Sequence, residues 1–291
     1  MTKYLVTGAT GQLGRGIVEN LLNRVPAHQI AVLVRNPSAV AEFASLGVSV
    51  RQGDYEDRSS LDAAFNGINK LLFVSTTAFS DAITQHHNVI NAAATAGVHH
   101  IHYTGIQRPA NSSFKISQVS EWELATERAL AESGMAVTLL RNVLYLDALA
   151  FMLGDRLLID GVRLPAGKAG AALAARSDLA EAAAVVLTQA GHEGRTYSLG
   201  GSEAVSMANI AQIVSSIADK RLPYVEITRE AFIDERVAAG LPRPVADFLS
   251  EWLAAVAAGE FADVTGDLER IIERKPLTAA QFFRNTFATP G

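Results

Sequence analysis

Three glycines near the amino terminus constrain the fold of this chain more than any other feature of its sequence. Gly8, Gly11 and Gly14 are spaced three residues apart, directly after the apolar run Tyr4–Thr7 and directly before a segment of helical period, Gly14–Asn23. The first glycine allows a sharp turn off a strand, the second allows a diphosphate to approach the backbone, and the third allows close helix packing. A plain tight turn is the alternative, but the flanking strand and helix favour a dinucleotide-binding loop.

The same segment indicates how a dinucleotide would be held. Backbone N–H groups from Thr10 to Leu13 lie at the positive end of the helix dipole, which stabilises a diphosphate without a basic side chain. The next apolar run ends in Arg35, where NAD-specific folds place a carboxylate on the ribose 2′-hydroxyl, about 20 residues after the glycines. A guanidinium suits a 2′-phosphate, and the alternative is a solvated arginine at a strand end. The pattern favours NADP(H) over NAD(H).

Short β-branched runs alternate with segments of helical period through the first half of the chain. This alternation predicts an α/β fold with a Rossmann-type, doubly wound parallel sheet of about six or seven strands. The expected strands are Tyr4–Thr7, Ile30–Val34, Val48–Arg51, Lys70–Val74, His99–Tyr103 and Ala136–Leu140. The expected helices after the first are Ser38–Leu46, Ser59–Phe65, Asp81–Ala96, Ser120–Ser133, Ser177–Gln189, Ser206–Ala218, Arg229–Ala239, Pro244–Ala258 and Asp267–Ile272.

The spacing of these elements changes from about Tyr145 onward, where Pro165 and Gly167 indicate loops. We therefore expect an NADP(H)-binding Rossmann domain at residues 1–145 and a smaller C-terminal α+β lobe at residues 146–291 that mostly binds substrate. The strand pattern at Thr196–Leu199 follows a helix pattern, so a segment near residues 177–200 is expected to return to the main sheet.

The composition argues against several kinds of partner. A net charge of -5 disfavours a nucleic-acid surface, and the absence of cysteine removes disulfides and thiolate metal sites. The apolar run at the amino terminus is too short for a signal peptide or a spanning helix, so we expect no membrane partner and a cytoplasmic location. His99, His100 and His102 are close in sequence, but no further ligand follows at helical or loop spacing. Packed or capping histidines are favoured, and no metal is expected.

Several motifs together resemble one family. The segment TGATGQLG is followed by VRNP after the second expected strand, GDYED after the third and LLRN after the sixth. In this combination the chain resembles the NmrA-like branch of the atypical short-chain dehydrogenases/reductases over most of its length. The order of QHHNVI, HHIHYTG, ATE and LLRNVLY is most similar to bacterial NADPH:quinone reductases and triphenylmethane reductases.

The resemblance implies roles for individual residues. For the adenosine half of the cofactor, it implies that Arg35 contacts the 2′-phosphate and that Asp54 and Tyr55 contact the edge of the adenine. The pyrophosphate would be bound by Thr10, Gly11, Gln12 and Leu13. The ribose and phosphates would be contacted by Ser75, Thr76 and Thr77, and the nicotinamide by Thr104 and Gly105. The expected substrate-binding residues are Phe79, Trp122, Glu123, Asn142 and Tyr145. Stacking on a flat acceptor and simple core packing both remain open for the aromatic members.

The chain departs from typical short-chain dehydrogenases on the helix after the fifth strand. Glu123 and Glu127 stand one turn apart where a Tyr-x-x-x-Lys pair would pass a proton to or from a hydroxyl. We therefore assign no catalytic residue and expect direct hydride transfer from NADPH to a quinone or related conjugated, small-molecule acceptor, as in the reductases that the chain resembles. The alternative is an NADP(H)-sensing regulator without turnover. A sugar-nucleotide epimerase is disfavoured by the same missing pair, and a homodimer remains open.

Overall fold

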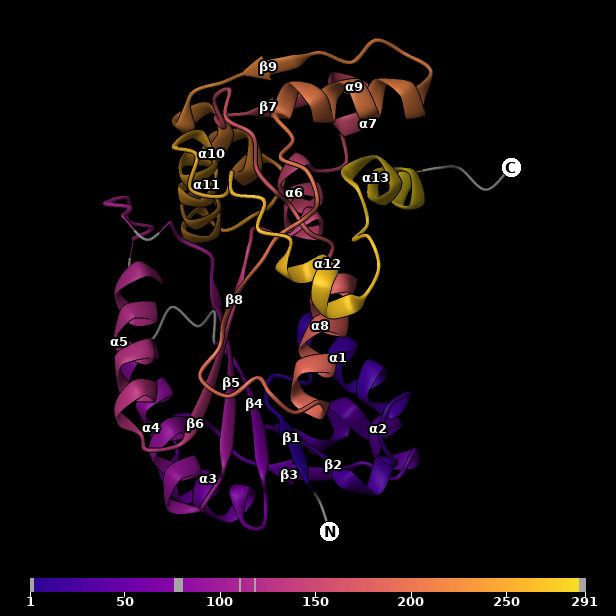
Figure 1. Cartoon of the computed structure of the whole chain (residues 1–291). Helices are drawn as coiled ribbons and strands as arrows, with labels where there is room; N and C mark the ends of the chain where they lie inside the picture. Colours follow the sequence, from indigo (N-terminus) through magenta and orange to yellow (C-terminus); the bar gives the residue numbers. More distant parts are fainter. Residues whose placement is uncertain (1–2, 76–80, 110, 118, 288–291) are drawn as a thin grey trace. The chain divides into compact units, whose positions relative to one another are not determined.

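The computed structural model describes residues 3–75, 81–109, 111–117 and 119–287 (Figure 1). Its residues divide into two compact units. The first unit comprises the described residues within 1–106, 118–141 and 176–197, and the second comprises those within 107–117, 142–175 and 198–291. A cofactor-binding role for the first unit and a substrate-binding role for the second stay predictions. No helix among the described residues combines the length and apolarity needed to cross a membrane.

A seven-stranded sheet organises the chain. Its strands are β1 (Tyr4–Val6), β2 (Ile30–Val34), β3 (Ser49–Gln52), β4 (Lys70–Val74), β5 (His100–Ile106), β6 (Ala136–Asn142) and β8 (Thr196–Leu199). They lie in the order β3-β2-β1-β4-β5-β6-β8, and parallel registers join β3 to β2, β2 to β1, β1 to β4 and β4 to β5. This order confirms the predicted Rossmann-type, doubly wound sheet, with its switch point between β1 and β4.

Helices cover both faces of the sheet in the first unit. These helices are α1 (Gln12–Leu22), α2 (Ala41–Ser45), α3 (Arg58–Phe65), α4 (Ala82–Thr95), α5 (Val119–Glu132) and α8 (Arg176–Thr188), with 3-10 turns at Ala27–Gln29 and Pro37–Val40. On one face α1 packs against α8, and on the other α3, α4 and α5 pack in a row (Figure 1). Beneath the second group, Leu61, Phe65, Phe73 and Val89 are buried in one apolar cluster with Tyr103. Because burial of such side chains drives folding, this cluster fixes α3 to α5 against the sheet.

The second unit is built from short elements. They are α6 (Leu146–Leu153), α7 (Leu157–Asp160), β7 (Val162–Leu164), α9 (Met207–Ala218), β9 (Tyr224–Glu226), α10 (Arg229–Ala238), α11 (Arg243–Ala257), α12 (Asp267–Ile272) and α13 (Ala279–Phe287). β7 and β9 form a separate parallel pair. The sequence did not predict α6, α7, β7, β9 or α13. Strands of three residues are too short to show an alternating pattern, and the segment that holds β9 was expected to be a connection only.

Candidate active site

The glycine loop forms a tight turn that ends at the first turn of α1. Gly8 has a positive φ of +65°, and its carbonyl oxygen accepts a hydrogen bond of 2.9 Å from the N–H of Gly11. A β-carbon on Gly14 would lie 2.2 Å from that same carbonyl oxygen, so only glycine fits there. Gly11 is the N-cap of α1 and has no side chain with which to satisfy the N–H groups of the first turn. These N–H groups and the helix dipole make the loop suitable for a diphosphate.

The individual residues of the loop are placed as an anion site requires. Thr10, Gly11 and Gln12 are exposed, whereas Leu13 and Gly14 are buried against the sheet. The exposed residues therefore offer their backbone to a ligand, and the buried ones fix the start of the helix. The structure thus brings together the residues that the sequence assigned to the pyrophosphate.

The loop lies beside the carboxyl end of β4. The hydroxyl of Thr7 accepts a hydrogen bond of 2.9 Å from the N–H of Val74, and a β-carbon on Gly8 would lie 3.2 Å from the Cβ of Val74. Ser75 follows directly and is half-buried. The glycine loop and Ser75 are therefore neighbours at the switch point of the sheet, where open α/β sheets bind their ligands.

The ends of β2 and β3 carry the residues expected at the adenosine half of the cofactor. Arg35 is exposed, and its carbonyl oxygen accepts a hydrogen bond of 3.2 Å from the Nε2 of Gln52. Asp54 is half-buried, and its N–H donates to the hydroxyl of Ser60 over 2.9 Å. Arg35 and Asp54 thus extend from adjacent strands of the sheet, as a site for a phosphorylated adenosine requires.

Tyr55 differs from the other expected adenine contacts. Its ring packs edge-on against Phe73, and its hydroxyl donates to the carbonyl oxygen of Val74 over 3.3 Å. Burial raises the pKa of Tyr55 above its ordinary range, and a hydrogen bond with Thr7 opposes this shift. The side chain therefore points toward the core and β4, so a contact with adenine at this position would come from the backbone of Tyr55.

A buried carboxyl group lies beside the ends of β4 and β5. The Oε1 atom of Glu123 on α5 accepts hydrogen bonds from the hydroxyl of Ser75 at 3.2 Å and from the hydroxyl of Tyr103 at 2.9 Å. Thr104 accepts a hydrogen bond of 3.2 Å from the N–H of Ser75, and a β-carbon on Gly105 would lie 2.7 Å from the Oε2 of Glu123. Burial and the Glu123 carboxyl raise the pKa of Tyr103 well above its ordinary range. Ser75, Thr104, Gly105 and Glu123 therefore form one cluster.

The remaining expected substrate residues are placed in several different ways. Trp122 is only 6% exposed on the inner face of α5, which favours the packing interpretation over stacking on an acceptor. In the second unit, the Nδ2 of buried Asn142 donates to the hydroxyl of half-buried Tyr145 over 3.1 Å, so these two form a pair. Thr76, Thr77 and Phe79 lie outside the described residues.

Comparison with known proteins identifies the family of this chain. Residues 2–280 match the NmrA-like family. The chain belongs to the NmrA-like family. It is 36% identical to quinone oxidoreductase 2 of Escherichia coli over 97% of this chain and 98% of that protein. It is 30% identical to the NAD(P)H azoreductase of Xenophilus azovorans over 99% of each chain. Among solved structures, the triphenylmethane reductase of Citrobacter sp. complexed with NADP(H) superimposes with a TM-score of 0.91 at 35% identity, covering 99% of this chain and 100% of that one.

The two glutamates on α5 of this NmrA-like protein have different surroundings. Glu127 forms two hydrogen bonds with the guanidinium of Arg141, at 3.0 and 2.8 Å, which hold α5 to β6. Glu123 faces the strand ends and contacts the hydroxyls of Ser75 and Tyr103 instead. Both glutamates could be singled out from the sequence, but Tyr103 could not. The only signal in the sequence for Tyr103 is its place in β5, because no local sequence pattern links Tyr103 to Glu123, 20 positions further along the chain.

Of the three histidines near β5, His100 and His102 pack inside the fold, whereas His99 is exposed. Among the described residues, no three histidine or acidic side chains gather in an arrangement that could hold a metal ion. His100 hydrogen-bonds the hydroxyl of Thr138 over 2.8 Å, and its ring lies 3.9 Å from that of His102. Burial lowers the pKa of His100 to about 4 and holds the pKa of His102 well below its ordinary value. These residues are therefore neutral core groups near neutral pH.

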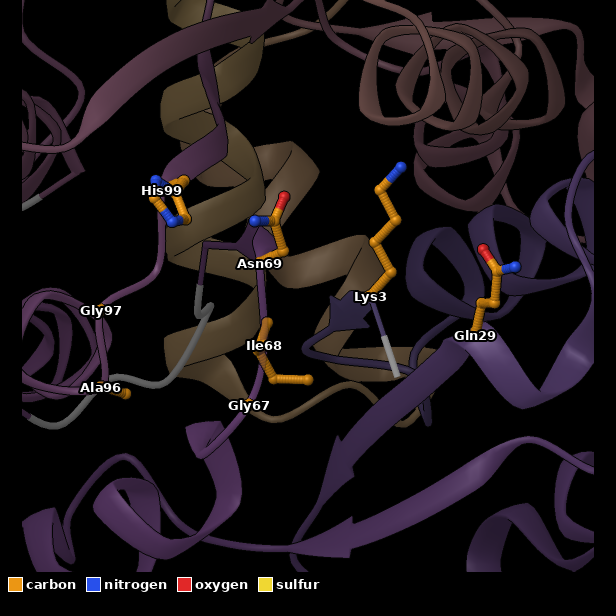
Figure 2. A pocket seen from close by; sticks show the side chains of 8 residues that line it. All are labelled: Lys3, Gln29, Gly67, Ile68, Asn69, Ala96, Gly97 and His99. Atoms are coloured by element: carbon orange, nitrogen blue, oxygen red, sulfur yellow. The ribbon is translucent and has the colours of Figure 1, made fainter. Parts of the chain in front are cut away.

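One open hollow in the first unit lies away from the glycine loop. It measures about 630 Å³ and is lined by Lys3, Gln29, Gly67, Ile68, Asn69, Ala96, Gly97 and His99 (Figure 2). Lys3, Asn69 and His99 precede β1, β4 and β5, so the hollow lies at the amino ends of these parallel strands. The glycine loop and Ser75 follow the carboxyl ends. The hollow is therefore at the opposite edge of the sheet from the candidate active site.

Proposed function

We propose that this chain is an NADPH-dependent reductase that transfers a hydride to a quinone or a related conjugated aromatic acceptor. The observation that carries the proposal is the exposed glycine loop at the switch point, with Ser75 and the Glu123 carboxyl beside it. Relatives that match nearly the whole chain support the same activity, because their names state quinone and azo-dye reduction. A neighbouring structure that holds NADP(H) supports the choice of cofactor.

The residues at the switch point of the sheet fit this cofactor. N–H groups from Thr10 to Leu13 would bind the diphosphate, and the exposed guanidinium of Arg35 would pair with the 2′-phosphate. The remaining cofactor contacts that we propose are made by Gly8, Gly14, Asp54, Tyr55, Ser75, Thr76, Thr77, Thr104 and Gly105. When bound, NADPH supplies the hydride. The protein's part is to orient the cofactor and to exclude water. It does not include proton transfer by the usual pair, because the described part of α5 has carboxylates where other short-chain dehydrogenases have a tyrosine and a lysine.

The chemistry of α5 limits the class of acceptor. Reduction of an isolated ketone needs a proton donor at the oxygen, and Glu127 is already paired with Arg141. A quinone or a cationic dye delocalises the incoming electron pair, so it depends less on a positioned acid. We propose Trp122, Glu123, Asn142, Tyr145 and Phe79 as the residues on the acceptor side, with burial limiting Trp122 and Glu123 to supporting roles. A cytoplasmic location belongs to the same proposal, and a homodimer stays a prediction.

Steady-state turnover tests the proposal. Purified protein is mixed with NADPH or NADH and a panel of a naphthoquinone, an azo dye, a triphenylmethane dye and a simple ketone, and loss of the reduced nicotinamide is followed. We expect oxidation of NADPH with the conjugated acceptors and none with the ketone. Tight NADPH binding without turnover on any acceptor would indicate the NADP(H)-sensing alternative. Failure to bind either nucleotide would contradict the proposal altogether.

A further inference from the structure

Glu123 is an acidic side chain enclosed by the fold. It is 2% exposed, and its neighbour Tyr103 is fully buried on β5. Removing a carboxyl group from water costs free energy unless hydrogen bonds replace its hydration, and here two hydroxyls donate to a single oxygen of Glu123. Leu130, on the same face of α5, is equally buried but apolar, as packing alone would favour. A buried carboxyl on this face therefore calls for an explanation beyond packing.

The contacts of Glu123 join three elements at one point. Tyr103 fixes the carboxyl from inside the sheet, and Ser75 reaches it from the end of β4. On the β5 side the second carboxyl oxygen lies so close to the backbone that a β-carbon on Gly105 would come within 2.7 Å of it. The N–H of Ser75 is fixed separately by the hydroxyl of Thr104. Both the backbone and the hydroxyl of Ser75 are thereby oriented.

The direction of the hydrogen bond at Ser75 determines what its hydroxyl can recognise. A serine hydroxyl has one hydrogen to donate and two lone pairs with which to accept. Because Ser75 donates its one hydrogen to Glu123, its oxygen can act toward a bound ligand only as an acceptor. A ribose hydroxyl is a donor that would satisfy this oxygen, whereas a phosphate offers only acceptors.

We propose that Glu123, held by Tyr103, is a positioning residue that orients the Ser75 hydroxyl to accept a hydrogen bond from the nicotinamide ribose. This inference rests on the proposed function, since it assumes that NADPH binds at the switch point. Glu123 acts through Ser75 and transfers no proton itself. Glu123 stands where other short-chain dehydrogenases have the tyrosine of their Tyr-x-x-x-Lys pair, but its chemical role here is orientation.

A double-mutant cycle tests this coupling. Glu123→Gln and Ser75→Ala are made singly and together, and NADPH affinity is measured by fluorescence titration alongside the single-turnover rate of hydride transfer to a quinone. We expect each single variant to lower affinity and rate about three- to tenfold, because Ser75→Ala removes the hydroxyl and the neutral amide oxygen of Glu123→Gln accepts more weakly than a carboxylate. Because the two act through one interaction, the double variant should be no worse than Ser75→Ala by more than about twofold.

Two further variants separate orientation from folding. Tyr103→Phe keeps the ring but removes the hydroxyl that holds the carboxyl, and it should reproduce part of the loss seen in Glu123→Gln. Glu121→Gln removes an exposed carboxyl on the same helix and should match the wild type. Thermal unfolding of each cofactor-free variant shows whether it is folded. If Glu123→Gln does not fold, the affinity and rate of Tyr103→Phe test the positioning role in its place.

Each outcome bears on a different conclusion. Additive losses in the double variant, or wild-type affinity and rate in both Glu123→Gln and Tyr103→Phe, would overturn the positioning role while leaving the reductase proposal intact. Absence of NADPH binding or turnover in the wild type would contradict the proposed function, and this inference with it.

Discussion

Acid should destabilise this protein through histidines that are buried in their neutral form. His86 on α4 is fully buried between Phe73 and Tyr103 and hydrogen-bonds the hydroxyl of Thr126 over 2.7 Å. Burial, with a small contribution from the charge of His87, lowers the pKa of His86 to about 4. The imidazole is therefore neutral in the folded protein at pH values where an exposed histidine is already charged.

His100 on β5 behaves in the same way. It is 3% exposed, and burial lowers its pKa to about 4 from an ordinary value of 6.5. The charges of Lys70 and His192 contribute to this lowering of the pKa, and Glu193 opposes it from 3.7 Å. His86 and His100 thus carry similar shifts from different surroundings.

The sign and size of the effect follow from proton binding in the two states. Below about pH 6.5 the unfolded chain binds a proton at each of these histidines, whereas the folded chain does not until about pH 4, so stability falls as the pH falls. Since one pKa unit corresponds to about 1.4 kcal/mol, lowering the pH from about 7 to about 5 should cost about 2 kcal/mol for each histidine. Together they should cost about 4 kcal/mol, and His102 adds to this loss.

Urea unfolding at several pH values between about 7 and 5 measures this loss. His86→Gln should reduce the pH-dependent loss by about 2 kcal/mol, whatever it does to stability at neutral pH. His87→Gln removes an exposed neighbour on the same helix and serves as the matched control, and most of the wild-type pH dependence should remain because the charge of His87 causes only a small part of the shift at His86. The reasoning would be refuted by a His86→Gln variant whose unfolding free energy changes with pH as steeply as that of the wild type.

Three substitutions test the account at other points. Gly14→Ala places a β-carbon 2.2 Å from the carbonyl oxygen of Gly8, so we expect NADPH affinity to fall more than about tenfold in a fluorescence titration, and unchanged affinity would contradict the loop assignment. Arg35→Glu puts like charges together at the 2′-phosphate and should weaken NADPH by about tenfold or more while changing NADH little, as competitive titrations would show. Phe73→Ala leaves a cavity in the apolar cluster and should lower the free energy of unfolding by about 3–5 kcal/mol in urea, and a loss under about 1 kcal/mol would argue against its burial.

The sequence predicted the elements whose signal is local. The glycine loop and the alternation of strands and helices depend on neighbouring residues, and they correctly predicted the doubly wound sheet and a helix directly after the loop, although α1 begins at Gln12 and not at Gly14. Arg35 and Asp54 could be placed in the same way, because Arg35 follows β2 directly and Asp54 lies two residues after the end of β3. Residues that follow the carboxyl ends of parallel strands meet at one edge of the sheet, and this does not depend on the fold of the rest of the chain.

What the sequence could not predict depends on contacts between distant residues. The pairing of Tyr103 with Glu123 needs the packing of α5 on β5, and the orientation of Tyr55 toward Phe73 needs the core. The side chains of Glu123 and Tyr55 carry polar groups, so the sequence pattern alone would equally allow each of them to face solvent. The short elements of the second unit lack periodicity, and so only tertiary packing defines them.

Transfer of a labelled hydride tests the central claim most directly. The protein is mixed with NADPH deuterated at the transferred position of the nicotinamide and with a cationic triphenylmethane dye, and the colourless product is examined by mass spectrometry. The central carbon of this product holds its hydrogen without exchange, so direct transfer predicts one deuterium in each product molecule. A colourless product without deuterium, or no reduction of any conjugated acceptor, would contradict hydride transfer from NADPH by this protein.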